Sequence, residues 1–316
     1  MSKEKRKFRV LVVDDSNTVR ATLVNHLKKG HLKLYSGYEI TPEVAVDGLE
    51  ALSKVEKTKY DLVISDIVMP NMNGFELISS LSRRHPHLCT VLITSSDVED
   101  YIKMALVYNV TNIITKTNPF NFEEFSRVIH SLLTKENIFG LENYLSTGAD
   151  VYSILIEDKE TIRTTIDRIK SLASNTQLDE TVVKKFVLST EEAVLNACIY
   201  STVEIEDSER PKFSFFQALE NFSPVNVSFG YDEEKLAISI TDSGGKLKKD
   251  DILYWISRNI SGEGVFDNHG RGLFLMRVNT DRMIINVDPG KKTEIVLIKY
   301  FEPKYEGHKP LYINQV

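Results

Sequence analysis

Acidic side chains follow two short apolar runs in the first quarter of the chain. Asp14 and Asp15 come directly after residues 8–13, and Asp66 comes directly after residues 62–65. Continuous apolar runs of this length are typical of parallel strands that are buried on both faces. Because the carboxyl ends of such strands meet at one edge of a sheet, the three carboxylates would converge on a set of oxygen ligands suited to Mg²⁺. The alternative is a strand-ending aspartate that only caps a turn.

A hydroxyl and an ammonium group are expected at the same edge. Thr94 follows the apolar residues 91–93, and Lys116 follows residues 112–115. A metal ion and a lysine offset anionic charge, a hydroxyl hydrogen-bonds an oxygen, and a carboxylate can attack as a nucleophile. The pattern therefore favours a phosphoryl-transfer site with Asp66 as the acceptor.

These residues, in this order, resemble the receiver domain of two-component response regulators over about residues 7–133. The resemblance implies that Asp66 accepts a phosphoryl group from a cognate sensor histidine kinase. Other residues would hold Mg²⁺ or sense the phosphoryl group. Beside Asp66, the implied Mg²⁺ ligands are Asp14, Asp15 and the Val68 carbonyl, and the implied sensors are Thr94 and Lys116.

The sequence departs from this family at two positions. A proline usually follows the lysine directly and forms a cis peptide bond, whereas Thr117 and Asn118 here come before Pro119. The position three residues before the lysine, often an aromatic that moves inward on activation, is Ile113. Switching would therefore use another element, for which Tyr108 is a candidate.

The elements that position these residues follow from periodicity. Apolar residues recur every four positions in a predicted helix from Ser16 to about Lys29, which Gly30 ends. Strand and helix patterns then alternate up to a last helix over residues 122–133. This alternation predicts an α/β domain with a doubly wound parallel sheet of five strands.

In the second half, a carboxylate and an amide lie on one predicted long helix that begins near Asp179 and ends near Tyr200. Glu192 and Asn196 are four residues apart and therefore share a helix face. A solvated polar stripe would look the same. Asp242 ends the predicted strand 236–241.

Glycines and a threonine add to this pattern. Gly244 follows Asp242 in a flexible turn, and Gly270 and Gly272 precede an apolar run that begins a helix. Glycines at a helix start let backbone amides approach phosphates. Thr293 opens a predicted terminal strand. Each feature could instead be an ordinary hairpin turn, a helix-start loop or an edge strand.

The set resembles the ATP-binding fold of histidine kinases, gyrase-type ATPases and, most closely, bacterial anti-sigma factor serine kinases, across about residues 149–303. The resemblance implies that Asn196 coordinates Mg²⁺ at the ATP phosphates and that Glu192 is the general base on a protein hydroxyl. The other implied residues surround ATP. Asp242 would bind the adenine amino group, Thr293 would lie near adenine, and Gly244, Gly270 and Gly272 would shape the pocket and its lid.

The expected domain order is a receiver domain at 1–133, a linker or hinge helix at 134–148, an ATP-binding domain at 149–303 and a tail at 304–316. The hinge would be the only covalent connection between the two halves. The second domain is expected to be an α/β two-layer sandwich with a mixed sheet.

The composition of the chain argues against several classes of protein. The net charge is −6 and no basic cluster is interleaved with aromatics, which argues against nucleic-acid binding. No apolar stretch is long enough to cross a membrane, and Cys89 and Cys198 lack metal-ligand spacing. We therefore expect a cytoplasmic protein with two buried thiols.

The function expected from the whole sequence is a phosphorylation-controlled protein serine/threonine kinase and partner-switching factor, with Mg²⁺ and ATP as cofactors. Its output partner would be an anti-sigma antagonist-like protein, a sigma factor or both, and a homodimer is possible. The alternative is a non-catalytic, phosphorylation-gated binding module, which Lys246 in place of a usual glycine and the long insertion 204–223 favour. A third alternative is a degenerate dimerisation platform.

Overall fold

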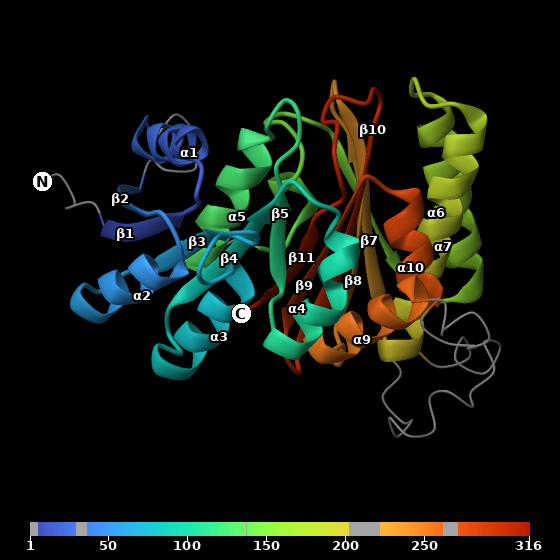
Figure 1. The fold of residues 1–316 in the computed structure, drawn as a ribbon. Coiled ribbons are helices and arrows are strands. Elements are labelled where there is room, and N and C mark those ends of the chain that lie inside the picture. Colours follow the sequence, from blue (N-terminus) through green and yellow to red (C-terminus); the bar gives the residue numbers. More distant parts are fainter. Residues whose placement is uncertain (1–5, 30–36, 137, 202–221, 262–270) are drawn as a thin grey trace, which may run out of the picture. The chain divides into compact units, whose positions relative to one another are not determined.

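The computed structural model describes residues 6–29, 37–136, 138–201, 222–261 and 271–316 of the 316-residue chain (Figure 1). The chain divides into two compact units. The N-terminal unit comprises Met1–Glu136 and Tyr305–Leu311, and the C-terminal unit comprises Asn137–Lys304 and Tyr312–Val316.

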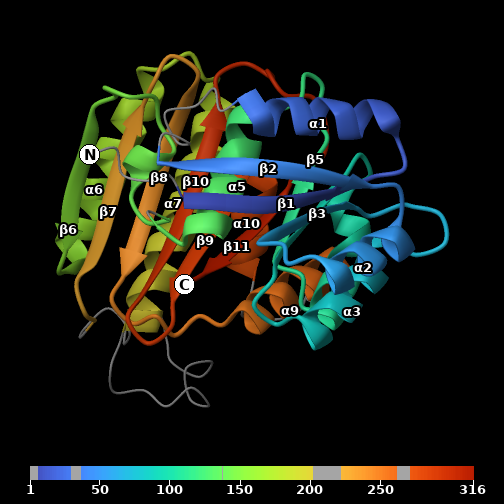
Figure 2. The ribbon, with the colours of Figure 1, turned by 90° about the vertical axis from the view of Figure 1, so that its left-hand side faces the viewer.

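The N-terminal unit contains a parallel sheet in the order β2-β1-β3-β4-β5, which confirms the predicted five-stranded doubly wound sheet. Helices cover both faces of this sheet (Figure 2). On one face, His26 of α1 stacks on Phe122 of α5 with 4.4 Å between ring centroids. The strands are β1 (Arg6–Val13), β2 (Tyr38–Ala45), β3 (Leu62–Asp66), β4 (Cys89–Thr94) and β5 (Asn112–Thr115). The helices are α1 (Asn17–Lys29), α2 (Gly48–Lys57), α3 (Gly74–Arg84), η2 (Val98–Tyr101), α4 (Ile102–Tyr108) and α5 (Phe122–Thr134).

Local sequence fixes the starts of these helices. The Asn73 side chain accepts a hydrogen bond from the backbone N–H of Glu76, whose carboxylate accepts one from the N–H of Asn73, so a capping box starts α3. Gly74 is required there, because a Cβ would lie 2.3 Å from the Asp66 carbonyl oxygen. The predicted cap Ser16 accepts the N–H of Val19 at 3.5 Å. Gly30, the predicted end of α1, lies outside the described residues.

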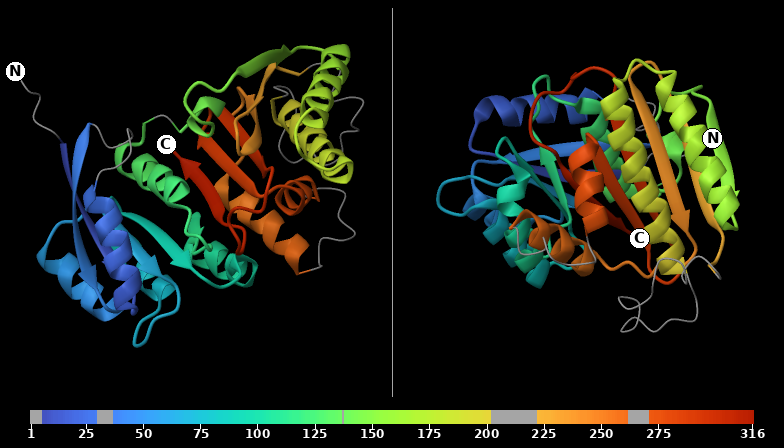
Figure 3. Two further views of the ribbon diagram at one scale, coloured as in Figure 1. Left: turned by 90° about the horizontal axis from the view of Figure 1, so that it is seen from above. Right: turned by 90° about the vertical axis from the view of Figure 1, so that its right-hand side faces the viewer.

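The C-terminal unit contains a mixed sheet in the order β11-β9-β10-β8-β7-β6, in which only the β11–β9 pair is parallel among the pairs described (Figure 3). This arrangement confirms the predicted α/β class with a mixed sheet. The strands are β6 (Val151–Ile156), β7 (Val225–Tyr231), β8 (Lys235–Asp242), β9 (Arg282–Asp288), β10 (Lys292–Tyr300) and β11 (Leu311–Gln315). The helices are η3 (Leu141–Asn143), α6 (Lys159–Ser174), α7 (Glu180–Ser201), α9 (Lys249–Ile260) and α10 (Arg271–Asn279).

Residues 138–145 pack against this sheet and do not form a hinge helix. The structure has only a 3₁₀ turn there, and α5 ends at Thr134. The apolar residues that predicted a helix are buried because they cover the sheet; they are Ile138, Leu141 and Leu145, together with Tyr144.

A buried polar network fixes this segment. The Asn286 amide donates to the Ile138 carbonyl at 2.6 Å, to the Tyr144 hydroxyl at 2.9 Å and to Glu294 at 2.9 Å. Glu294 also accepts the N–H of Gly140 at 3.0 Å. The segment predicted as a linker therefore belongs structurally to the C-terminal unit.

The end of the chain also differs from the predicted tail. Residues 311–315 form β11, which pairs with β9, so β10 is an interior strand and not the terminal one. Residues 305–311 belong to the N-terminal unit. The expectation of a single covalent connection is therefore wrong, because the chain passes between the units at 136–137, at 304–305 and at 311–312.

Candidate functional site

Asp14, Asp66 and Lys116 meet at the carboxyl edge of the parallel sheet. Asp14 follows β1, Asp66 ends the neighbouring strand β3, and Lys116 follows β5, which lies one strand further along beyond β4. The parallel sheet therefore brings the three residues to one edge. The Lys116 ammonium donates to Asp14 Oδ2 at 2.8 Å and to Asp66 Oδ1 at 2.6 Å. The spacing of these residues along the sequence therefore predicted a real cluster.

Burial controls the electrostatics of this cluster. Burial raises the pKa of the Asp66 carboxyl, although the hydrogen bond and charge of Lys116 act in the opposite direction. Burial by itself would lower the pKa of Lys116, because it favours the neutral amine. The hydrogen bonds and charges of Asp14 and Asp66 outweigh burial and raise this pKa. Lys116 is consequently a fixed positive charge beside the Asp66 carboxylate.

Thr94 joins the same edge from β4. It is 1% exposed, and its hydroxyl oxygen accepts the N–H of Ser96 at 3.0 Å. The N–H of Lys116 donates to the Thr94 carbonyl at 2.7 Å, so the loops that begin at the two predicted sensors are hydrogen-bonded to each other.

The predicted Mg²⁺ ligands are only partly assembled. The Asp15 side chain is exposed, and the described residues contain no cluster of three histidine, cysteine or acidic side chains arranged to hold a metal. Asp14 and Asp66 do converge, and carboxylate oxygens are the donors that Mg²⁺ prefers. The donor chemistry fits Mg²⁺, with Asp15 and the Val68 carbonyl as the expected additional ligands.

The positions that depart from the receiver family also have defined surroundings. Ile113 is fully buried, and Tyr108 packs on Phe75 with 5.7 Å between ring centroids. Tyr101 packs on the same ring at 5.9 Å, which adds a second aromatic candidate that the sequence did not single out. The peptide bond between Asn118 and Pro119 is cis.

The second site is a pocket between the mixed sheet and its helices. It encloses about 510 Å³ of space between atoms, its open mouth included. The sequence-predicted residues Asn196, Asp242 and Thr293 line it together. The remaining lining residues come from the sheet, from α7, α9 and α10, and from the loop before α9; they are Ala197, Ile240, Leu247, Trp255, Leu273 and Ile295.

Glu192 and Asn196 lie against the first turn of α10. A Cβ on Gly272 would be 2.7 Å from Asn196 Nδ2 and 3.0 Å from Glu192 Oε2, so only glycine lets α10 approach both side chains. Burial and then the neighbouring charge of Glu191 raise the pKa of Glu192. A carboxylate of this kind is suited to accept a proton.

Asp242 is a buried carboxyl group in the lining of the pocket. Burial raises the pKa of its carboxyl, while the N–H groups of Gly244 and Gly245 act in the opposite direction, at 2.8 Å and 3.2 Å from Oδ1. Thr293 stands opposite Asp242 in the β8–β10 register. A carboxylate and a hydroxyl at one end of an apolar pocket could recognise the edge of a heteroaromatic ring.

Sequence reasoning missed part of this pocket. The helix α9, which carries Trp255, was not predicted, although its apolar positions recur at helical spacing. Gly270 and His269 lie outside the described residues, as does most of the predicted lid.

Among the described residues, no helix is long and apolar enough to cross a membrane. Cys198 is buried, which raises the pKa of its thiol to about 12, whereas Cys89 is half-buried.

Two family models match this chain, one in each half. Residues 10–130 match the family model of the response regulator receiver domain, and residues 156–299 match that of the histidine kinase-like ATPase domain.

Individual relatives resemble only part of the chain. The transcription factor SKN7 of Candida albicans is 34% identical over 134 residues, which is 42% of this chain and 22% of SKN7. The transcriptional regulatory protein MalR of Bacillus subtilis is 27% identical over 137 residues, which is 43% of this chain and 55% of MalR. The chain thus spans about a fifth to a half of the length of these curated relatives.

Among solved structures, the chemotaxis protein CheY4 of Vibrio cholerae is 30% identical, with a TM-score of 0.34, and the match covers 41% of this chain and 100% of CheY4. The two family models are therefore what identifies the domains. This chain joins a response regulator receiver domain, residues 10–130, to a histidine kinase-like ATPase domain, residues 156–299.

Proposed function

We propose that phosphorylation of Asp66 controls an ATP-binding output domain that acts as a protein serine/threonine kinase and partner-switching factor. A sensor histidine kinase would supply the phosphoryl group. An Asp66 oxygen would form the new bond to phosphorus while the bond to the donor imidazole breaks, and Lys116 would offset the charge that develops. Mg²⁺, held by Asp14, Asp15 and Asp66, would neutralise the phosphoryl oxygens.

The observation that carries the output proposal is the contact of Gly272 with Glu192 and Asn196 beside the pocket of Asp242 and Thr293. An amide that can bind Mg²⁺, a carboxylate that can accept a proton and a helix start that can approach phosphates are adjacent there. Glu192 would take the proton of a serine or threonine hydroxyl while that oxygen forms a bond to the γ-phosphorus and ADP leaves. The partner would resemble an anti-sigma antagonist, and a sigma factor could dock on the same domain.

Trp255 gives a direct test of nucleotide binding. It is the only tryptophan of the sequence and it lines the pocket, so its fluorescence should change when the full-length protein is titrated with ATP and Mg²⁺. Asn196→Ala and Gly272→Ala should each weaken binding by about tenfold or more, which is about 1.4 kcal/mol. The control Asn175→Ala, at the exposed end of α6, should bind like the original protein. A folded protein that leaves ATP unbound would rule out this function.

The non-catalytic alternative predicts binding without phosphotransfer. Lys246 in the Asp242 turn and the insertion 204–223 favour this alternative. A purified antagonist-type protein and labelled ATP would distinguish the two functions. The kinase should transfer label to a serine or threonine, and Glu192→Ala should lose transfer while it keeps ATP binding. Transfer at the original rate in that variant would remove Glu192 from the role of base.

A further inference from the structure

Residues 305–311, which we term the strap, connect two strands of the C-terminal unit but belong to the N-terminal unit. The strap follows β10 and leads directly into β11. Its middle residues, Glu306 to His308, are exposed and form no helix, whereas Pro310 and Leu311 at its end are buried.

The first contacts are with the loop that begins at Lys116. The N–H of Asn118 donates to the Glu306 carbonyl at 2.8 Å, and the N–H of Glu306 donates to the Asn118 carbonyl at 3.1 Å. Gly307 has φ +146°, and a Cβ there would lie 3.3 Å from the Cα and Cγ2 atoms of Thr117. This glycine lets the strap lie directly on the loop.

A further contact reaches the loop that begins at Thr94. His308 Nδ1 lies 3.2 Å from Asp97 Oδ2, three residues after Thr94. The strap therefore contacts both loops whose first residues are the expected sensors of the phosphoryl group.

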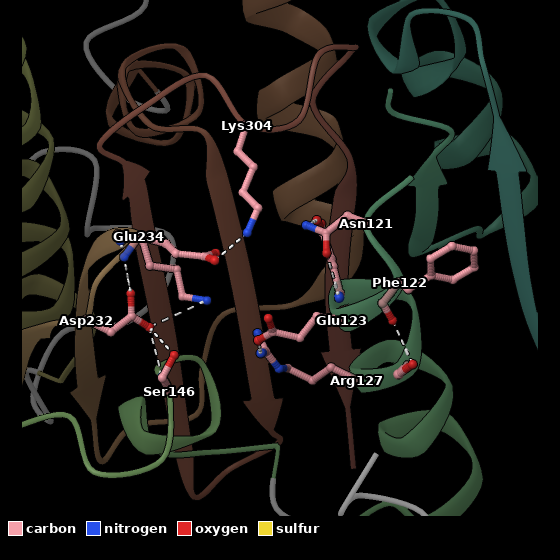
Figure 4. A network of polar contacts seen from close by, with 11 residues as sticks. Asn121, Phe122, Glu123, Arg127, Ser146, Asp232, Glu234 and Lys304 are labelled. Atoms are coloured by element: carbon pink, nitrogen blue, oxygen red, sulfur yellow. Dashed lines mark hydrogen bonds and ion pairs between the residues drawn. The ribbon is translucent and has the colours of Figure 1, made fainter. Parts of the chain in front are cut away.

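Both ends of the strap are fixed in the C-terminal unit. At its start, Lys304 forms an ion pair with Glu234 in the β7–β8 turn (Figure 4). The N–H of Phe301 donates to the Glu234 carbonyl at 2.9 Å. At its end, Asn314 of β11 donates to the Asn286 side chain at 2.8 Å.

Asn286 connects this end to the pocket. It hydrogen-bonds Glu294, whose neighbour Thr293 lines the pocket. The strap is therefore connected, through β11 and the side chains of Asn314 and Asn286, to the strand that carries Thr293.

We propose that the strap transmits the phosphorylation state of Asp66 to the ATP pocket, a proposal that rests on the proposed function. A phosphoryl group on Asp66 attracts Lys116 and Thr94. This attraction moves the two loops that begin at these residues, and the strap that contacts both loops then displaces β11. Coupling free energies between distant sites typically change affinity by about 5- to 150-fold.

The test is the ATP affinity of the full-length protein, followed by Trp255 fluorescence with and without beryllium fluoride, a phosphoryl mimic for Asp66. In the original protein, beryllium fluoride with Mg²⁺ should change the dissociation constant for ATP by at least about fivefold. Asp66→Asn should abolish this response. Gly307→Val, which forces the strap off Thr117, should reduce it to less than about twofold while ATP binding persists.

The matched control is Gly148→Val. Gly148 also has a positive φ, of +95°, but a Cβ there meets no atom within 4 Å, so the variant carries similar backbone strain without touching the strap. It should respond like the original protein. Should Gly307→Val fail to fold, Glu306→Pro, which removes the N–H that donates to Asn118, should give the same loss.

Two results would overturn the proposal: a full response in Gly307→Val or Glu306→Pro, or no response in the original protein although it binds ATP. Absence of ATP binding in the original protein would instead reject the proposed function itself, so the two failures are distinguishable.

Discussion

At the scale of residues, Lys116 holds two carboxylates together. The Asp14 side chain is 1% exposed and that of Asp66 is 9% exposed, and both accept from its ammonium group. An isolated buried carboxylate is costly, and two adjacent ones repel each other. The lysine therefore serves stability as well as the chemistry proposed for it.

Lys116→Ala should lower the free energy of unfolding by about 3 kcal/mol, the size typical of a buried pair that loses one partner. Mg²⁺ should recover more of this loss in the variant than it adds to the original protein, because it can replace the missing positive charge. Urea unfolding with and without Mg²⁺ measures both effects. Lys54→Ala is the control, since its pair with Glu50 is more than a third exposed at both side chains, and it should cost less than about 1 kcal/mol. Equal losses of unfolding free energy in Lys116→Ala and Lys54→Ala would contradict this prediction.

Sequence spacing predicted which of these side chains lie together, because sheets and helices are periodic. Asp14 and Lys116 follow strands of one parallel sheet, Asp66 ends another, and Glu192 and Asn196 are one helical turn apart. The partners of Asn286 were not predictable in this way. Its contacts join residues 148 positions apart, and no local pattern encodes which loop covers a sheet face.

At the scale of elements, residues 138–145 act as part of the ATPase domain. A chain that begins at residue 149 lacks the four buried apolar side chains of this segment and exposes Asn286 and Glu294. At about 1.5 kcal/mol per buried side chain, the loss is on the order of 6 kcal/mol as an upper estimate. Residues 149–316 should therefore melt at a much lower temperature than residues 137–316, measured by circular dichroism. Equal melting temperatures would show that the segment adds no stability.

The β7–β8 turn contains a pH-sensitive contact. Burial favours the neutral form of Asp232, but the N–H groups of Glu234 and Ser146, which donate to it at 2.9 Å each, outweigh burial and lower its pKa (Figure 4). A carboxyl with a lowered pKa adds stability above its unfolded value, and this stability is lost as the pH falls through the folded value.

Asp232→Asn should therefore lower the free energy of unfolding by about 2 kcal/mol near neutral pH. The difference from the original protein should shrink as the pH falls below the ordinary aspartate value of 3.8, since the carboxyl is then protonated in both states. Chemical unfolding across pH 3 to 7 measures it. Asp288→Asn serves as the control, because its carboxylate pairs with the exposed Lys291. A difference that stays constant over this range would contradict the assignment.

At the scale of the whole molecule, the sequence predicted two domains but not the way in which their segments interleave. Composition and periodicity locate each domain because each has its own sheet and core. The strap gives no such signal: residues 305–311 are short, mostly polar and contain no periodic pattern, and only their partners in the N-terminal unit reveal where they belong.

The strap also determines when each domain can be completed during synthesis. The N-terminal unit includes residues 305–311, so the ribosome completes this unit only after it has synthesised residues 137–304 of the C-terminal unit. The last strand of the C-terminal sheet, β11, is synthesised later still. A truncated translation product would thus leave both domains incomplete. For the same reason, recombination that exchanged one domain for a relative at a single crossover would separate residues 305–311 from the loops they contact.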